Sequence, residues 1–194
     1  RERRKVHDRR GELRLEGGTR NGPPATAAAG VDPPRVVLRA QGTVSAEGLR
    51  LAPELGFLSR LARHATGGAA YLGTLGFRGA APELVLMSNL QGFGLNLPAP
   101  LGKSPETVLP LRYENTLIAR APWQPNAPAQ QDQLLIELGR LASAAYVRDI
   151  SGPEPQVLRG SIGVGLAAGE SPPVREQGVA ANIHLASLNV DAWE

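Results

Sequence analysis

The sequence predicts a mainly β protein with one helix. Stretches in which apolar and polar residues alternate recur along most of the 194 residues, and such alternation is typical of strands that bury one face. The chain also contains 23 glycines and 17 prolines, which indicate many turns between strands. A single stretch, at about residues 52–65, instead has apolar residues at helical spacing followed by a Gly-Gly pair.

The chain divides into two predicted regions at residue 34. Residues 1–34 comprise a basic head, a short strand at residues 10–17 with one charged face, and a Pro- and Gly-rich linker at residues 21–34. Residues 35–194 hold the rest of the predicted sheet and the helix.

The distribution of charge argues against a nucleic-acid partner. The net charge is +3, yet six of the 21 basic residues lie among the first ten, where they outnumber the acidic ones by four. The remainder of the chain therefore carries a net charge of −1 and has no general attraction to phosphate backbones. We interpret the basic head as a solvated strand edge or linker, with contact to anionic lipid head groups as the alternative.

The sequence gives little support for a catalytic or cofactor-binding motif. The chain has no cysteine, and its three histidines, His7, His64 and His184, are each more than fifty residues apart, so no metal-ligand pair or catalytic triad stands out. The Gly-rich string at residues 163–169 has neither the spacing of a dinucleotide loop nor a following helix, so we interpret it as a strand. We expect no enzyme, no cofactor and no metal.

The first large strand and the helix follow one another. Residues 35–46 alternate as a strand, and the helical stretch then places Leu51, Leu55, Leu58, Leu61 and Ala62 on one stripe. Pro53 is tolerated if the helix begins at about Ala52. We expect this helix to dock at the end of the neighbouring hairpin and to leave Leu86 and Leu95 uncovered.

The central stretch, residues 71–105, reads as a β-hairpin. Two alternating runs flank a Gly-Ala-Ala-Pro break at residues 79–82, and the alternation resumes after a further glycine. Taking every second residue gives one apolar face, composed of Tyr71, Gly73, Leu75, Phe77, Leu84, Leu86, Ser88, Leu90, Phe93, Leu95 and Leu97. The opposite face is mixed.

Further strands are predicted at residues 109–113, 116–120, 157–167 and 179–185. Glycines in the third of these favour strong sheet curvature. Residues 134–147 fit either an apolar helical stripe or two strands, and propensity favours the helix.

The segment SNLQGFGLNLPAPLGK at residues 88–103, with LPLRY at residues 109–113, resembles the periplasmic body of the AsmA-like envelope proteins of the YhdP type. The stretch at residues 178–193 is also similar to that family. The resemblance implies a long, curved, open antiparallel β-sheet that forms an apolar groove, and it favours two strands at residues 134–147, which we adopt.

The resemblance also implies a function. Proteins of this family are implicated in phospholipid transport between the inner and outer membranes of Gram-negative bacteria, so we expect a periplasmic segment of an inner-membrane-anchored protein whose anchor and export signal lie elsewhere. The expected partners are phospholipid acyl chains, both membranes and neighbouring segments of the same longer chain. The expected groove lining is Tyr71, Leu75, Phe77, Leu84, Leu86, Leu90, Phe93, Leu95, Leu97, Ile162, Val164, Leu166, Ile183 and Leu185.

The sequence is also compatible with two other functions. A closed structural or adhesive β-domain would bury the apolar face in a core, as most apolar faces do. A hydrolase would instead show a polar cleft with convergent His, Ser or carboxylate groups.

Overall fold

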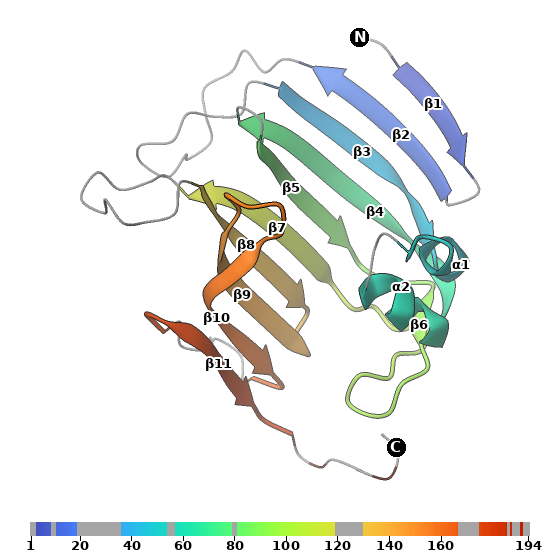
Figure 1. The fold of residues 1–194 in the computed structure, drawn as a ribbon. Helices are drawn as coiled ribbons and strands as arrows, with labels where there is room; N and C mark the ends of the chain where they lie inside the picture. Colours follow the sequence, from blue (N-terminus) through green and yellow to red (C-terminus); the bar gives the residue numbers. More distant parts are fainter. Residues whose placement is uncertain are drawn as a thin grey trace.

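The computed structural model describes residues 3–8, 11–18, 36–53, 57–78, 81–118, 130–166 and 175–185, together with residues 187 and 191. Within these residues, eleven strands form one open, twisted and curved sheet (Figure 1). Ten of them follow the order β1-β2-β3-β4-β5-β7-β8-β9-β10-β11, and β6 pairs separately with β4. The predicted fold class, a mainly β protein with an open antiparallel sheet, is confirmed.

The strand bounds follow the sequence pattern with small shifts. The strands are β1 Arg3–Asp8, β2 Gly11–Gly18, β3 Val36–Ser45, β4 Ala65–Arg78, β5 Ala81–Ser88, β6 Phe93–Leu95, β7 Leu111–Ile118, β8 Gln131–Leu138, β9 Ala142–Asp149, β10 Gln156–Val164 and β11 Gly178–Ile183. Neighbouring strands are antiparallel except β10 and β11, which are parallel.

Strands β1 and β2 belong to the same sheet as the rest of the chain. β1 pairs with β2, and β2 pairs with β3 from Leu13 opposite Gly42 to Gly18 opposite Val37. The predicted boundary at residue 34 therefore does not separate two structural units. The predicted linker at residues 21–34 lies outside the described residues.

The described helical residues between β3 and β4 include two short α-helices and a 3₁₀ turn. Helix α1 (Ala46–Arg50) begins directly after β3, where the Ser45 side chain accepts a hydrogen bond from the Gly48 N–H. Helix α2 (Phe57–Leu61) follows and runs into the 3₁₀ turn η2 (Ala62–His64). The predicted helix at residues 52–65 is helical from Phe57 to His64, as α2 and η2, and its residues 54–56 lie outside the described residues. Helix α1 is a further short helix that the prediction did not include.

Residues 134–147 form two strands, as predicted. β8 and β9 pair along their whole length, from Gln131 opposite Asp149 to Leu138 opposite Ala142. Gly139 has a φ of 52°, which glycine adopts readily, and it turns the chain between the two strands. In contrast, the two short strands predicted at residues 109–113 and 116–120 are one strand, β7.

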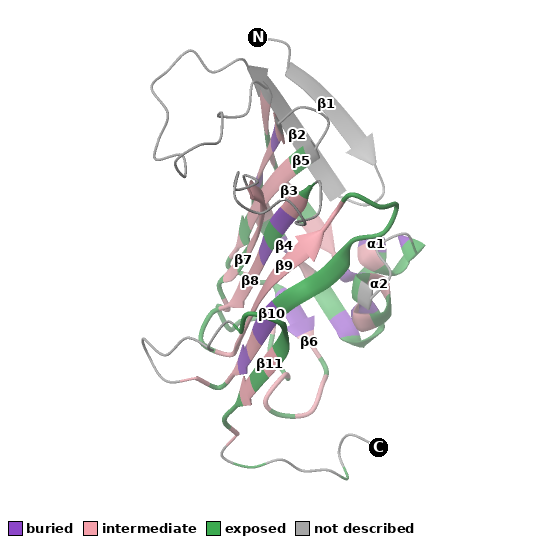
Figure 2. Cartoon of the chain, turned by 60° about the vertical axis from the view of Figure 1, so that its left-hand side comes forward, coloured by how far each residue is buried: buried purple, intermediate pink, exposed green. Residues whose placement is uncertain are grey.

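The fully buried core is small and lies at one end of the sheet. Ala46 of α1 packs with Ala65 and Ala69 of β4 and with Phe93 of β6, and Leu49, Leu90 and Leu95 pack around them. Figure 2 shows that most strand residues elsewhere are intermediate or exposed and that only a few are buried. The sheet is therefore a single layer over most of its length.

Candidate functional site: an apolar sheet face

The strand register brings apolar residues from eight strands onto one side of the sheet. Residues paired across strands share a face, so the pairing can be followed from strand to strand. One such row, from β3 to β11, is Ala40, Gly73, Leu86, Tyr113, Ile136, Ala144, Ile162 and Ala181. The row contains no charged residue.

Neighbouring rows on the same side are also rich in large apolar residues. We call this side the apolar face and define it by Leu38, Tyr71, Leu75, Phe77, Leu84, Leu86, Leu111, Tyr113, Leu134, Ile136, Leu138, Tyr146, Ile162, Val164, Val179 and Ile183. Most of the positions between them hold alanine or glycine, and Ser88 and Asn115 are polar residues on this side. The face is continuous from β3 to β11.

Most of the apolar face has no second layer over it in the part of the chain that the structure describes. Helix α1 packs on the ends of β3 and β4, and α2 packs beside it at that end (Figure 1). Leu134, at the centre of the face, is 9% exposed, whereas Val179 and Ile183 on β11 are 49% and 55% exposed. The face is therefore shielded at Leu134 and open at β11.

Glycine allows an aromatic ring to lie flat on the face. A Cβ at Gly160 would stand 2.4 Å from Cδ1 of Tyr146, on the neighbouring strand β9. The ring of Tyr146 therefore covers Gly160, and any side chain at that position would displace it.

Eight of the fourteen predicted lining residues lie together on the apolar face. They are Tyr71, Leu75, Phe77, Leu84, Leu86, Ile162, Val164 and Ile183. Burial raises the pKa of the Tyr71 hydroxyl, as expected for a phenol in apolar surroundings.

The other six predicted residues lie elsewhere. Leu90, Phe93 and Leu95 belong to the core cluster beside Ala46 of α1, so the expectation that Leu95 stays uncovered is wrong. Leu97 is half-buried in the loop after β6, and Leu185 is half-buried after β11.

Leu166 lies on the side of the sheet opposite the apolar face. A Cβ at Gly163 would stand 2.5 Å from Cδ1 of Leu166 and 3.0 Å from the Ser143 hydroxyl oxygen, so the Leu166 side chain covers Gly163 on that side. The cause is Gly165, whose φ of 65° turns the chain after β10 and ends the alternation. The predicted strand at residues 157–167 therefore ends at Val164.

The motif at residues 88–103 forms a tightly bonded loop at the core end of the sheet. The Lys103 ammonium donates to the carbonyl oxygens of Leu90, Phe93 and Ser104 at 2.8, 2.7 and 3.0 Å. Desolvation lowers the pKa of Lys103, and the nearby Glu106 partly opposes this shift. Gly92 has a φ of 89°, and a Cβ there would stand 2.5 Å from the Gly68 carbonyl oxygen. The motif residues thus have structural roles, since they position Phe93 in the core.

The Lys103→Met variant should lower the free energy of unfolding by about 2 kcal/mol, because it removes the charged donor from two partly buried carbonyl oxygens, those of Leu90 and Phe93, and from the exposed carbonyl of Ser104. Chemical denaturation monitored by circular dichroism measures this change. Arg140→Met, at an exposed position in the β8–β9 turn, is the matched control and should change stability by less than about 0.5 kcal/mol. Equal stabilities of the two variants would contradict this role of Lys103.

One charged pair lies on the apolar side of the sheet, at the end of the strands remote from the helices. Asp132 of β8 and Arg148 of β9 face each other, two residues beyond Leu134 and Tyr146. The guanidinium donates from Nε to Oδ1 at 2.9 Å and from Nη2 to Oδ2 at 2.5 Å. This bidentate hydrogen bonding to Asp132 raises the pKa of Arg148, to which the charge interaction with Tyr113 also contributes.

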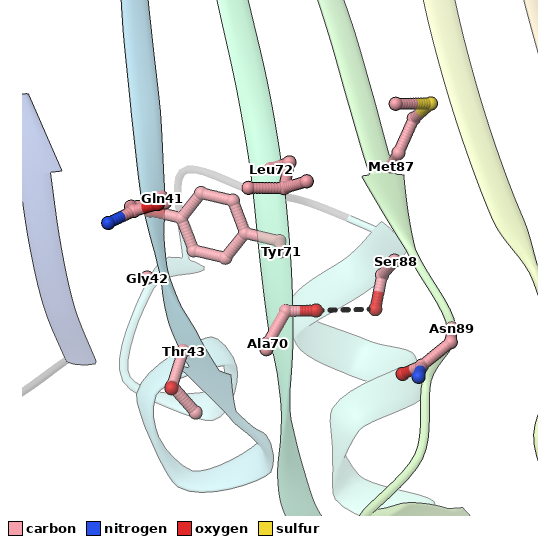
Figure 3. Close-up of a pocket in the computed structure, with 9 residues that line it drawn as sticks. All are labelled: Gln41, Gly42, Thr43, Ala70, Tyr71, Leu72, Met87, Ser88 and Asn89. Atoms are coloured by element: carbon pink, nitrogen blue, oxygen red, sulfur yellow. Dashed lines mark hydrogen bonds between the residues drawn. The ribbon is translucent and has the colours of Figure 1, made fainter. Parts of the chain in front are cut away.

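The opposite face of the sheet is mixed, as predicted. It carries Arg39 and Gln41 on β3 and an ion pair between Arg112 and Glu114 on β7. A shallow depression of about 630 Å³ lies mainly on this side, between β3, β4 and β5 (Figure 3). It is lined by Gln41, Gly42, Thr43, Ala70, Tyr71, Leu72, Met87, Ser88 and Asn89.

The described residues contain no group of three His, Cys, Asp or Glu side chains placed to hold a metal ion. None of the helices within them is both long enough and apolar enough to span a membrane. Comparisons of the chain with models of protein families, with curated proteins and with solved structures find no match.

Proposed function

We propose that this chain is a segment of a periplasmic, non-enzymatic conduit that carries phospholipid between the inner and outer membranes. The observation that carries the proposal is the apolar face, which continues across β3 to β11 in a single-layer sheet. The motif at residues 88–103 and its similarity to AsmA-like envelope proteins support the choice of compartment and of cargo.

The apolar face suits an acyl chain for a simple energetic reason. Each methylene kept out of water contributes about 0.8 kcal/mol, so a 16-carbon chain meets a barrier on the order of 12 kcal/mol in crossing an aqueous space. A continuous apolar surface removes much of this barrier. Because contacts to methylenes are non-directional, the acyl chains can slide over the face without a fixed binding residue of their own.

The dimensions of the face also fit this role. At about 4.8 Å per strand, the eight strands from β3 to β11 along the sheet span about 34 Å. This length can hold a lipid but is short for an envelope crossing. We therefore propose that the sheet continues through neighbouring segments of a longer, inner-membrane-anchored chain, which would pair with the outer strands β1 and β11.

A closed structural or adhesive β-domain is the second candidate. It requires a layer packed over the apolar face, whereas all eleven described strands lie in one sheet and the described helices cover only one end of it. The single-layer arrangement therefore favours the conduit.

Purified chain should carry phospholipid. If the 194-residue chain is expressed in a Gram-negative host and isolated without harsh detergent, native mass spectrometry should detect bound diacyl lipid, because the apolar face otherwise contacts water. Lipid-free protein that also fails to take up a fluorescent phospholipid from vesicles would contradict the proposal.

A further inference from the structure

We propose that Arg148 binds the phosphate group of the carried phospholipid and holds the headgroup at one margin of the apolar face. This inference rests on the proposed lipid-carrying function and adds to it a site, a ligand chemistry and an orientation. The acyl chains would extend from this margin along the strands towards the helices.

The position of the ion pair suits a headgroup site. Asp132 is two residues from Leu134 along β8, and Arg148 is two residues from Tyr146 along β9. Both side chains therefore project from the apolar side of the sheet. Leu117 lies opposite Asp132, and the half-exposed Val157 lies opposite Arg148. A lipid lying on Leu134 and Ile136 would therefore bring its polar end to Arg148.

The geometry of the pair leaves Arg148 able to bind a second anion. Asp132 occupies Nε and one hydrogen of Nη2, and the Nη1 group has no hydrogen-bond partner among the described residues. The Asp132 side chain is 3% exposed, whereas that of Arg148 is 18% exposed. The carboxylate is thus a buried positioning group, and the guanidinium is the member of the pair that a ligand can reach.

Arginine is suited to this task because its planar, permanently charged guanidinium presents five donors in a fixed arrangement that matches phosphate oxygens. A buried ion pair is also a costly way to stabilise a sheet, since apolar residues of similar volume often serve as well. Stability alone therefore does not account for this pair on a largely apolar surface, whereas binding of an anionic ligand does.

The chain offers a matched control on the other side of the sheet. Arg112 also donates to a carboxylate, that of Glu114, but it lies on the mixed face and its side chain is 48% exposed. If the phosphate bound any surface arginine without preference, it would bind Arg112 as readily as Arg148.

The test compares two fluorescent lipids with identical acyl chains, a phosphatidic acid and a diacylglycerol, in binding assays with the 194-residue chain. Wild type should bind the phosphate-bearing lipid about tenfold more tightly. The double variant Asp132→Asn/Arg148→Gln removes both charges without leaving either unpaired. It should reduce that ratio to about one while diacylglycerol binding is unchanged. Arg112→Gln should keep the wild-type ratio.

The outcomes separate the two proposals. Equal wild-type affinities for the two lipids, or a double variant that keeps the preference, would overturn the role of Arg148 while leaving lipid binding intact. Failure of wild type to bind either lipid would overturn the conduit itself. Inorganic phosphate should compete only weakly, because it lacks acyl chains, and full displacement by it would assign the site to free anions instead.

Discussion

Replacing Leu86 with glutamate should abolish lipid binding by the apolar face. Leu86 lies in the middle of the face between Gly73 and Tyr113, so an acyl chain there would cover the introduced carboxylate. An uncompensated charge under an acyl chain costs several kcal/mol, and each 1.4 kcal/mol is a factor of ten in affinity. We therefore expect the affinity for a fluorescent phospholipid to fall by at least about a hundredfold.

The neighbouring residue supplies the control. Met87 is 46% exposed on the opposite face, and its cross-strand partner Arg112 can donate hydrogen bonds to a carboxylate. Met87→Glu should therefore bind lipid like wild type. Similar losses in Leu86→Glu and Met87→Glu, with circular dichroism spectra unchanged, would show that the two faces do not differ in the way that the register requires.

The second large effect concerns stability. Phe93→Ala should lower the free energy of unfolding by about 3 to 5 kcal/mol, because Phe93 is the largest side chain of the core cluster and only 8% exposed. Few other large side chains in the described residues are buried, so this loss is a large share of the total stability of an ordinary domain. Urea denaturation followed by circular dichroism measures it.

Leu58→Ala is the comparison for this prediction. Leu58 lies on the adjacent helix α2 but is 51% exposed, so its truncation should change stability by less than about 0.5 kcal/mol. If the Phe93 and Leu58 variants unfolded at the same urea concentration, the core would not lie between α1 and β6.

The sequence predicted the faces of the strands better than the ends of the elements. Alternation correctly assigned residues such as Leu75, Leu86 and Ile162 to one side, because the side-chain period of a strand is fixed at two. It misplaced Leu166, since nothing in the alternation shows that Gly165 adopts a left-handed conformation. It also misjudged Leu95, because covering by α1 depends on where that helix begins.

The ion pair was missed although the sequence contains a signal for it. Asp132 and Arg148 stand at equal distances from the turn between β8 and β9, each two residues beyond an apolar residue of the same face. Once residues 131–149 are treated as a hairpin, the register places the two opposite charges side by side. The ambiguity of residues 134–147 between helix and strand hid this relation, because a helix would not align them.

The most direct test of the central claim is photo-crosslinking along strand β8. A photoreactive amino acid would replace Leu134, Leu135, Ile136, Glu137 and Leu138 in turn, and each variant would be irradiated in the presence of phospholipid vesicles. If the apolar face carries lipid, mass spectrometry should find lipid adducts at 136 and 138, fewer at the buried position 134, and few at 135 and 137. Adducts of equal yield at all five positions, or none at 136, would contradict the account.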